Sequence, residues 1–161
     1  MAKEFNLENL KKAYQKVQEK YDLPDFEKLN EDFQIEKLSE IETDFLLREI
    51  RKLIADRFFN YARFVESLLN PVNVSMLVFS VIKTLDVKGK ERLTEIYKKL
   101  AKREIELIEL DINSTEEKEA EFIKESYRLW QDIKKDFLSI IKIVKKNWDN
   151  KSEVNGKGYF G

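Results

Sequence analysis

The sequence contains no cysteine and no histidine, and these two absences exclude most of the familiar chemistry of active sites. Without cysteine the chain has no disulfide, no thiolate nucleophile, no zinc ribbon and no iron–sulfur cluster. Without histidine it lacks the Ser-His-Asp triad, the HExxH zinc site, haem ligation by histidine and the Glu-x-x-His motif of di-iron bundles. A bound metal would need oxygen ligands alone, which leaves Mg²⁺, Mn²⁺ or Ca²⁺.

Glycine and proline are also scarce, with four and two copies among 161 residues, so the chain should have few turns and long elements. Hydrophobic residues make up 42% and charged residues 38%, and the abundance of Leu, Ile, Lys and Glu favours helices over strands. We therefore predict a single all-α domain over residues 1–149, followed by a polar C-terminal tail over residues 150–161. Its fold should be an up-and-down bundle of five to six helices, two of them about 30 residues or longer.

Long hydrophobic runs are missing as well. The N-terminal MAKEFNLENL lacks the apolar core of a signal peptide. The longest apolar-rich stretch, Val72 to Leu85, is shorter than the roughly 20 residues that span a bilayer. The absence of cysteine and of an export signal fits a reducing compartment. We therefore expect a cytoplasmic protein that does not enter a membrane.

Apolar residues recur every three or four positions through most of the chain, which is the spacing of amphipathic helices. The expected helices cover 7–21, one or two segments within 25–38, 39–70, 74–85, 90–112, and a last segment that ends at about Asp149. The expected N-terminal caps are Asn6, Ser39, Asn73 and Ser114. The segment 74–85 is apolar nearly all round, so we expect a central buried helix there. The expected core includes Phe58, Tyr61, Leu100, Trp130, Ile133 and Phe137.

Several polar residues fall on the apolar faces of these helices. Arg57 lies near the middle of one such face, Glu104 lies at the centre of another, and Asp111 follows Glu104 by one heptad. Because an unpaired charge in a core is costly, we predict that Arg57 and Glu104 form an ion pair or share one polar cluster. Such a pair is either a bridge that sets helix register or an inward-facing ligand site. Glu119 and Ser126 share the apolar face of the last helix, where Ser126 either permits close helix approach or bonds back to a carbonyl.

Clustered carboxylates are the remaining route to catalysis. Glu106-x-x-Glu109 matches the first half of the Mg²⁺-binding pattern of all-α nucleotide pyrophosphohydrolases, but no ExxD follows, and both glutamates point away from the apolar face. We interpret them as part of a solvated acidic face. The chain also contains neither GxxxxGK[ST] nor GxGxxG, so nucleotide binding through a glycine-rich loop is unsupported. We therefore predict no catalytic residue, no metal site and no cofactor.

The C-terminal segment combines exposed basic and aromatic positions at Lys142, Lys145, Lys146, Trp148 and Lys151. Basic residues interleaved with aromatic ones bind RNA or single-stranded DNA, whereas lysines near a helix C-terminus also stabilise the helix itself. The net charge of −1 is spread in alternating blocks. Residues 103–125 contain three Lys/Arg and nine Asp/Glu, whereas residues 134–161 contain seven Lys/Arg and three Asp/Glu. Such blocks are more typical of complementary helix faces than of a nucleic-acid binder.

One family resemblance concerns about half of the chain. Leu23-Pro24-Asp25-Phe26 precedes a helix with Arg48, Arg51 and Arg57, and Ser114-Thr115-Glu116-Glu117 follows later. This arrangement resembles the α-helical domain of GINS replication-factor subunits. The middle of the chain departs from that family's pattern, so we carry no residue role over from it.

Three functions remain open after these observations. The first is a non-enzymatic helical protein-interaction or scaffold domain, whose partner is another protein or a second copy of the chain. The second is a nucleic-acid-associated protein, such as a replication or ribosome-linked subunit, that uses the basic C-terminal segment. The third is a Mg²⁺-dependent enzyme that uses carboxylates.

Overall fold

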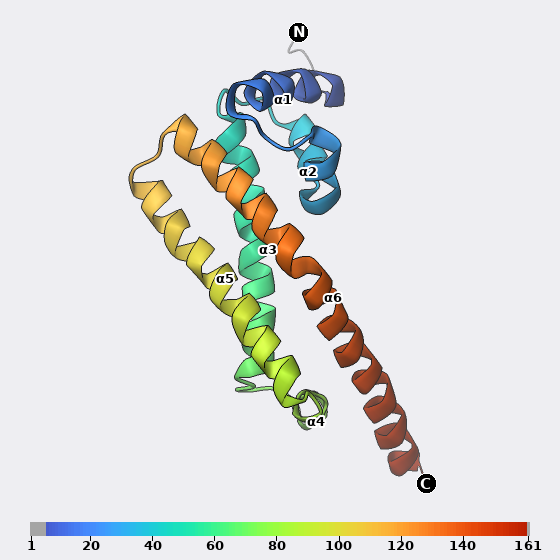
Figure 1. The fold of residues 1–161 in the computed structure, drawn as a ribbon. Coiled ribbons are helices and arrows are strands. Elements are labelled where there is room, and N and C mark those ends of the chain that lie inside the picture. Colours follow the sequence, from blue (N-terminus) through green and yellow to red (C-terminus); the bar gives the residue numbers. More distant parts are fainter. Residues whose placement is uncertain (1–5, 161) are drawn as a thin grey trace. The chain divides into compact units, whose positions relative to one another are not determined.

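The computed structural model describes the backbone of residues 6–160 and the side chains of residues 6–151. No strand occurs in this described part, so the predicted all-α fold is confirmed (Figure 1). The long helices have 24, 26 and 45 residues. The elements are α1 (Leu7–Tyr21), α2 (Phe26–Phe33), the 3-10 helix η1 (Ile35–Glu40), α3 (Leu46–Leu69), α4 (Met76–Lys83), α5 (Val87–Ile112) and α6 (Glu116–Phe160).

The chain divides into two compact units, and the three long helices each run from one into the other. Unit 1 comprises Met1–Phe59 and Lys102–Trp130, and unit 2 comprises Asn60–Ala101 and Gln131–Gly161. The single domain expected over residues 1–149 stays a prediction. The backbone of α6 continues as a helix to Phe160, through most of the segment expected to be a tail.

The first helices follow the predicted pattern closely. Asn6 caps α1, because its Oδ1 accepts a hydrogen bond from the Asn9 N–H at 3.0 Å. Helix α1 buries Leu10 and Tyr14 and ends at Tyr21, and the Asp22 cap after it adopts a left-handed conformation. The buried residues of α2 and η1 recur at the spacing of an amphipathic helix, and they are Phe26, Leu29, Phe33, Ile35 and Leu38.

The helix predicted over 39–70 begins later than expected. Ser39 lies inside η1, and Ile41 after it is extended, with φ −114° and ψ 120°. The capping box predicted at Ser39 is therefore wrong. Closer to α3, the Thr43 Oγ1 accepts a hydrogen bond from the Phe45 N–H at 3.0 Å, which forms a local turn before the helix begins at Leu46.

The segment 74–85 does not form the central buried helix that its composition predicts. Helix α4 is only eight residues long, and its first residue, Met76, is 82% exposed. Asn73 adopts φ 62°, a left-handed conformation that asparagine tolerates better than most residues. The cap therefore moves to Ser75, whose Oγ accepts a hydrogen bond from the Val78 N–H at 3.2 Å. Within α4 the buried residues are Val81 and Ile82, so the helix packs with one side only.

Helix α5 begins at Val87, three residues before the start of the helix expected over 90–112. The Asp86 Oδ1 accepts a hydrogen bond from the Gly89 N–H at 2.7 Å, so Asp86 is the N-terminal cap of α5. The backbone bond from the Lys90 N–H to the Asp86 carbonyl, at 3.0 Å, closes the first helical turn. A Cβ at Gly89 would lie 3.0 Å from the same carboxylate oxygen, so glycine leaves room for the cap.

Aromatic contacts hold α3 against its neighbours in each unit. In unit 1, the Phe58 ring lies 5.8 Å from that of Phe33 and 6.2 Å from that of Trp130. In unit 2, the Phe137 ring packs edge to face on Tyr61 at 5.5 Å and on Phe64 at 6.2 Å. Tyr61 is half-buried. The other predicted core residues are buried, namely Phe58, Leu100, Trp130, Ile133 and Phe137.

Candidate functional site

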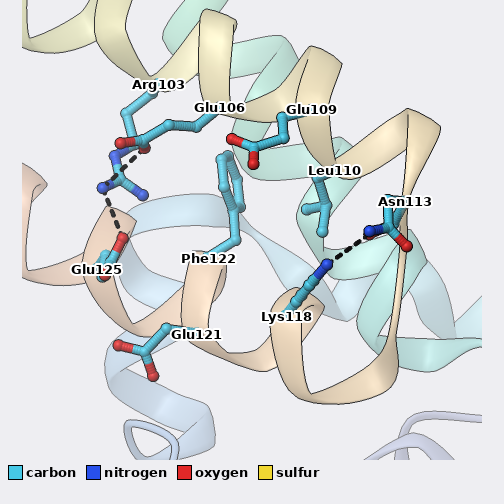
Figure 2. A pocket seen from close by; sticks show the side chains of 9 residues that line it. All are labelled: Arg103, Glu106, Glu109, Leu110, Asn113, Lys118, Glu121, Phe122 and Glu125. Atoms are coloured by element: carbon cyan, nitrogen blue, oxygen red, sulfur yellow. Dashed lines mark hydrogen bonds and ion pairs between the residues drawn. The ribbon is translucent and has the colours of Figure 1, made fainter.

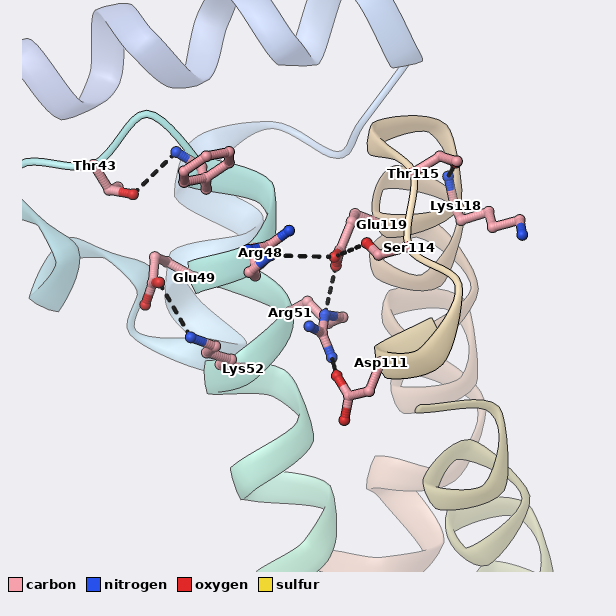
Figure 3. Close-up of polar contacts among 11 residues, drawn as sticks. Thr43, Arg48, Glu49, Arg51, Lys52, Asp111, Ser114, Thr115, Lys118 and Glu119 are labelled. Atoms are coloured by element: carbon pink, nitrogen blue, oxygen red, sulfur yellow. Dashed lines mark hydrogen bonds and ion pairs between the residues drawn. The ribbon is translucent and has the colours of Figure 1, made fainter. Parts of the chain in front are cut away.

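A buried ion pair joins α3 to the first turn of α6 in unit 1 (Figure 3). Arg51 is 4% exposed and Glu119 is 3% exposed, which makes them the buried charged side chains of the described chain. The Arg51 Nε lies 2.5 Å from the Glu119 Oε2, without the linear geometry of a hydrogen bond. The Arg51 Nη1 donates a hydrogen bond to the Asp111 Oδ1 at 2.7 Å. One guanidinium therefore connects three helices.

Further groups surround the Glu119 carboxylate. The Ser114 Oγ donates a hydrogen bond to the Glu119 Oε1 at 2.6 Å, and the Arg48 Nε lies 3.8 Å from the same oxygen. Thr115, not Ser114, caps α6, because its Oγ1 accepts a hydrogen bond from the Lys118 N–H at 3.2 Å. Glu119 also lies at the N-terminal end of α6, where the helix dipole favours negative charge. These contacts offset part of the desolvation cost of the buried pair.

The three charged residues predicted to be buried occupy different environments. Arg57 and Glu104 are both half-buried, and none of the ion pairs described in the structure joins them, so their pairing stays a prediction. The Asp111 side chain is 59% exposed, although it contacts the buried Arg51. Arg51 is a buried charge that was not predicted. Its spacing was a usable signal, because Arg51 lies four residues after the buried Leu47.

Ser126 lies on the buried face of α6, as its position predicts. Its side chain is 0% exposed, and its Oγ has no hydrogen-bond partner among the residues that the structure describes. The bond back to a carbonyl is therefore not formed there. The remaining explanation is that a small side chain permits close helix approach.

A pocket of about 250 Å³ lies between α5 and α6 in unit 1 (Figure 2). The Arg103 Nη2 donates a hydrogen bond to the Glu125 Oε2 at 2.7 Å and lies 2.9 Å from the Glu106 Oε2. The Arg103 guanidinium also lies over the Phe122 ring, 5.5 Å from its centroid. An arginine of the chain itself thus neutralises the first glutamate of the Glu106-x-x-Glu109 pattern. The side chains lining the pocket are Arg103, Glu106, Glu109, Leu110, Asn113, Lys118, Glu121, Phe122 and Glu125.

Acidic groups are numerous around this pocket, yet they do not converge on a metal position. Within residues 6–151, no group of three or more carboxylates is arranged so that it could hold a metal ion.

An exposed apolar stripe runs along α5 in unit 1. Ile105, Ile108 and Ile112 are 69%, 61% and 82% exposed. Their spacing of three and four residues places them on one side of the helix, and we call this stripe the isoleucine face. Isoleucine has a lower helix propensity than Lys or Glu, so neither burial nor helix formation accounts for three of them at exposed positions.

The residues predicted for nucleic-acid binding lie on the second half of α6. Lys142, Lys145, Lys146 and Lys151 are exposed, and so is Trp148. The first three lysines share one side of the helix, because they are spaced by three or four residues or are adjacent. These side chains are accessible, as binding to a nucleic acid requires.

No family model, no curated protein and no solved structure matches this chain. Among the helices of the described residues, none is long and apolar enough to cross a lipid bilayer.

Proposed function

We propose that this chain is a non-enzymatic, cytoplasmic protein-interaction domain, and that the isoleucine face of α5 binds a partner protein. The observation that carries this proposal is the exposure of Ile105, Ile108 and Ile112 at a spacing of three and four residues. Partners that dock along a helix use anchors at this spacing. Contiguous exposed apolar surface on a folded domain is also a common mark of an interaction site.

The neighbouring contacts support this proposal because they hold α5 in place. Arg103 of α5 bonds to Glu125 of α6, and Asp111 of α5 bonds to Arg51 of α3. The helix that carries the isoleucine face is therefore ordered before any partner arrives. A preorganised surface loses less conformational entropy on binding, so more of the contact energy contributes to affinity.

Affinity capture with the purified full chain tests this proposal. Ile108→Asp places a charge at the centre of the isoleucine face, and Leu138→Asp places one at a comparably exposed position of α6. We expect a captured partner to be lost with Ile108→Asp and retained with Leu138→Asp. Calorimetry with the purified partner should then show a loss of about tenfold or more for Ile108→Asp alone. Equal capture by both variants would contradict the proposal.

A second candidate is nucleic-acid binding through α6, favoured by the exposure of Lys142, Lys145, Lys146 and Trp148. Phosphate contacts release counterions, so affinity for single-stranded RNA should fall steeply between about 50 and 200 mM salt. Replacing the three lysines by glutamate should abolish that binding. Measurement by fluorescence anisotropy separates the two candidates, because Ile108→Asp should not affect RNA affinity.

A further inference from the structure

Resting on the proposed function, we infer that the partner of the isoleucine face is a basic amphipathic helix from another protein. Acidic side chains lie on both sides of the isoleucine face. Glu109 and Asp111 are exposed on α5 and flank Ile105, Ile108 and Ile112 on opposite sides. Residues 103–125, which contain the stripe, carry nine acidic residues against three basic ones.

The three basic residues of this segment already have contacts within it. Arg103 bonds to Glu125, the Lys118 Nζ donates to the Asn113 carbonyl at 3.2 Å, and the Lys124 Nζ lies 3.9 Å from the Glu121 Oε2. Glu109, by contrast, forms no ion pair in the part of the chain that the structure describes. Basic residues outside the segment pair with other carboxylates within it, as Arg51 does with Asp111 and Lys102 does with Glu106. The exposed Glu109 carboxylate is therefore the negative charge beside the apolar stripe that would attract cationic side chains.

The length of the isoleucine face and the main chain of α5 favour a helical partner. The stripe from Ile105 to Ile112 extends over about 10 Å along the helix axis, which matches two turns of a second helix packed by ridges into grooves. An added strand would need main-chain groups with which to pair. Helix α5 offers none there, because its interior N–H and C=O groups are bonded within the helix.

The same charges distinguish between another protein and a second copy of the chain as the occupant of the isoleucine face. A symmetric dimer formed through this face would bring Glu109 close to the same residue of the second copy. Like charges at an interface oppose association. A nucleic acid or an anionic membrane would meet the same repulsion, so a segment with Lys or Arg beside apolar anchors is the complementary occupant.

Three fluorescent peptides of about 20 residues test this inference. Each carries leucines at the spacing of a helical stripe, and the flanking positions are Lys in one, Gln in the second and Glu in the third. The full chain is titrated with each peptide at about 50 and 300 mM salt. We expect the Lys peptide to bind about tenfold more tightly than the Gln peptide at low salt, and the Glu peptide to bind most weakly. The advantage of the Lys peptide should shrink at high salt.

The variants Ile108→Asp and Leu138→Asp, checked by circular dichroism, distinguish the possible failures. Equal affinities for the Lys and Gln peptides, both lost with Ile108→Asp, would overturn the basic partner and leave the docking face intact. Binding that Ile108→Asp does not change, or no binding by any peptide, would overturn the docking face as well. A dimer in sedimentation that Ile108→Asp dissociates would show that a second copy, not a basic helix of another protein, occupies the face.

Discussion

The Arg51 Nε of α3 lies 2.5 Å from the Glu119 Oε2 of α6, and both side chains are almost completely removed from solvent. Solvent therefore screens neither charge effectively, and each depends on the other and on the groups beside it. The energetic value of such a pair appears when one member is removed, because the remaining charge then stays buried without its counterpart.

The first prediction concerns this pair. Arg51→Met or Glu119→Leu alone should lower the free energy of unfolding by about 3–5 kcal/mol. The double variant should recover much of that loss, since two apolar residues carry no desolvation cost. Urea unfolding of the four proteins gives the coupling energy. A coupling near zero would mean that Asp111 and Ser114 hold the two charges independently.

The second prediction concerns the core of unit 2. Phe137 is 2% exposed and contacts Tyr61 and Phe64, so Phe137→Ala should remove buried surface and leave a cavity. The expected loss in the free energy of unfolding is about 3–5 kcal/mol. Leu138→Ala, at the adjacent exposed position, is the matched control. A loss below about 1 kcal/mol at Phe137 would show that this contact is dispensable.

The third prediction concerns alkaline pH. Burial, with smaller contributions from Asp25 and Tyr127, raises the pKa of the Tyr14 hydroxyl, which donates a hydrogen bond to the Pro24 carbonyl at 2.5 Å. The fold thus favours neutral Tyr14, whereas the unfolded chain ionises it near pH 10. The contribution that neutral Tyr14 makes to the free energy of unfolding is therefore fully present below about pH 10, and it should be lost as the pH rises further.

Tyr14→Phe checks this relationship, because phenylalanine cannot ionise. Its free energy of unfolding should be lower near neutral pH by about 1 kcal/mol, for the lost hydrogen bond, yet it should decline less between about pH 9 and 11. Chemical unfolding across that range, with Tyr97→Phe as the control, measures both effects. The same decline in the Tyr14 variant and the original chain would rule out Tyr14 as its source.

The fourth prediction concerns the start of α5. Asp86→Ala removes the side-chain acceptor of the Gly89 N–H, and the expected loss of stability is about 1 kcal/mol. Asp86→Ser should retain most of the stability, because serine is also a good N-terminal cap. Thermal unfolding of both variants measures the two losses of stability. Equal losses for Asp86→Ala and Asp86→Ser would show that the side-chain acceptor at the cap is not their cause.

Periodicity predicted helix faces well and helix starts poorly. The inward positions of Phe26, Phe33 and Phe58 follow from spacing alone, because packing rewards every residue on one face. The position of an N-terminal cap depends instead on where the backbone changes from a non-helical to a helical conformation. Ser39 is a suitable cap by residue type, but it lies within the 3-10 helix η1, and the extended Ile41 follows before α3 begins.

The candidate site was only partly visible in the sequence. Arg51 and Arg57 both lie close to the apolar side of α3, and a helical wheel does not say which of them meets a carboxylate. That choice depends on Glu119, far along the chain. The exposure of the isoleucine face was also unpredictable, because an apolar stripe has the same spacing whether another helix covers it or not.

Unit 1 is discontinuous in the sequence, and this has a consequence for biosynthesis. The ribosome delivers Met1–Phe59 long before Lys102–Trp130, so Arg51 and Phe58 emerge while Glu119 and Trp130 are still untranslated. During that interval the nascent chain presents an uncovered apolar surface, which is the kind that chaperones bind. Completion of unit 1 is therefore a late event in synthesis, and a product terminated before Lys102 would be a substrate for proteolysis.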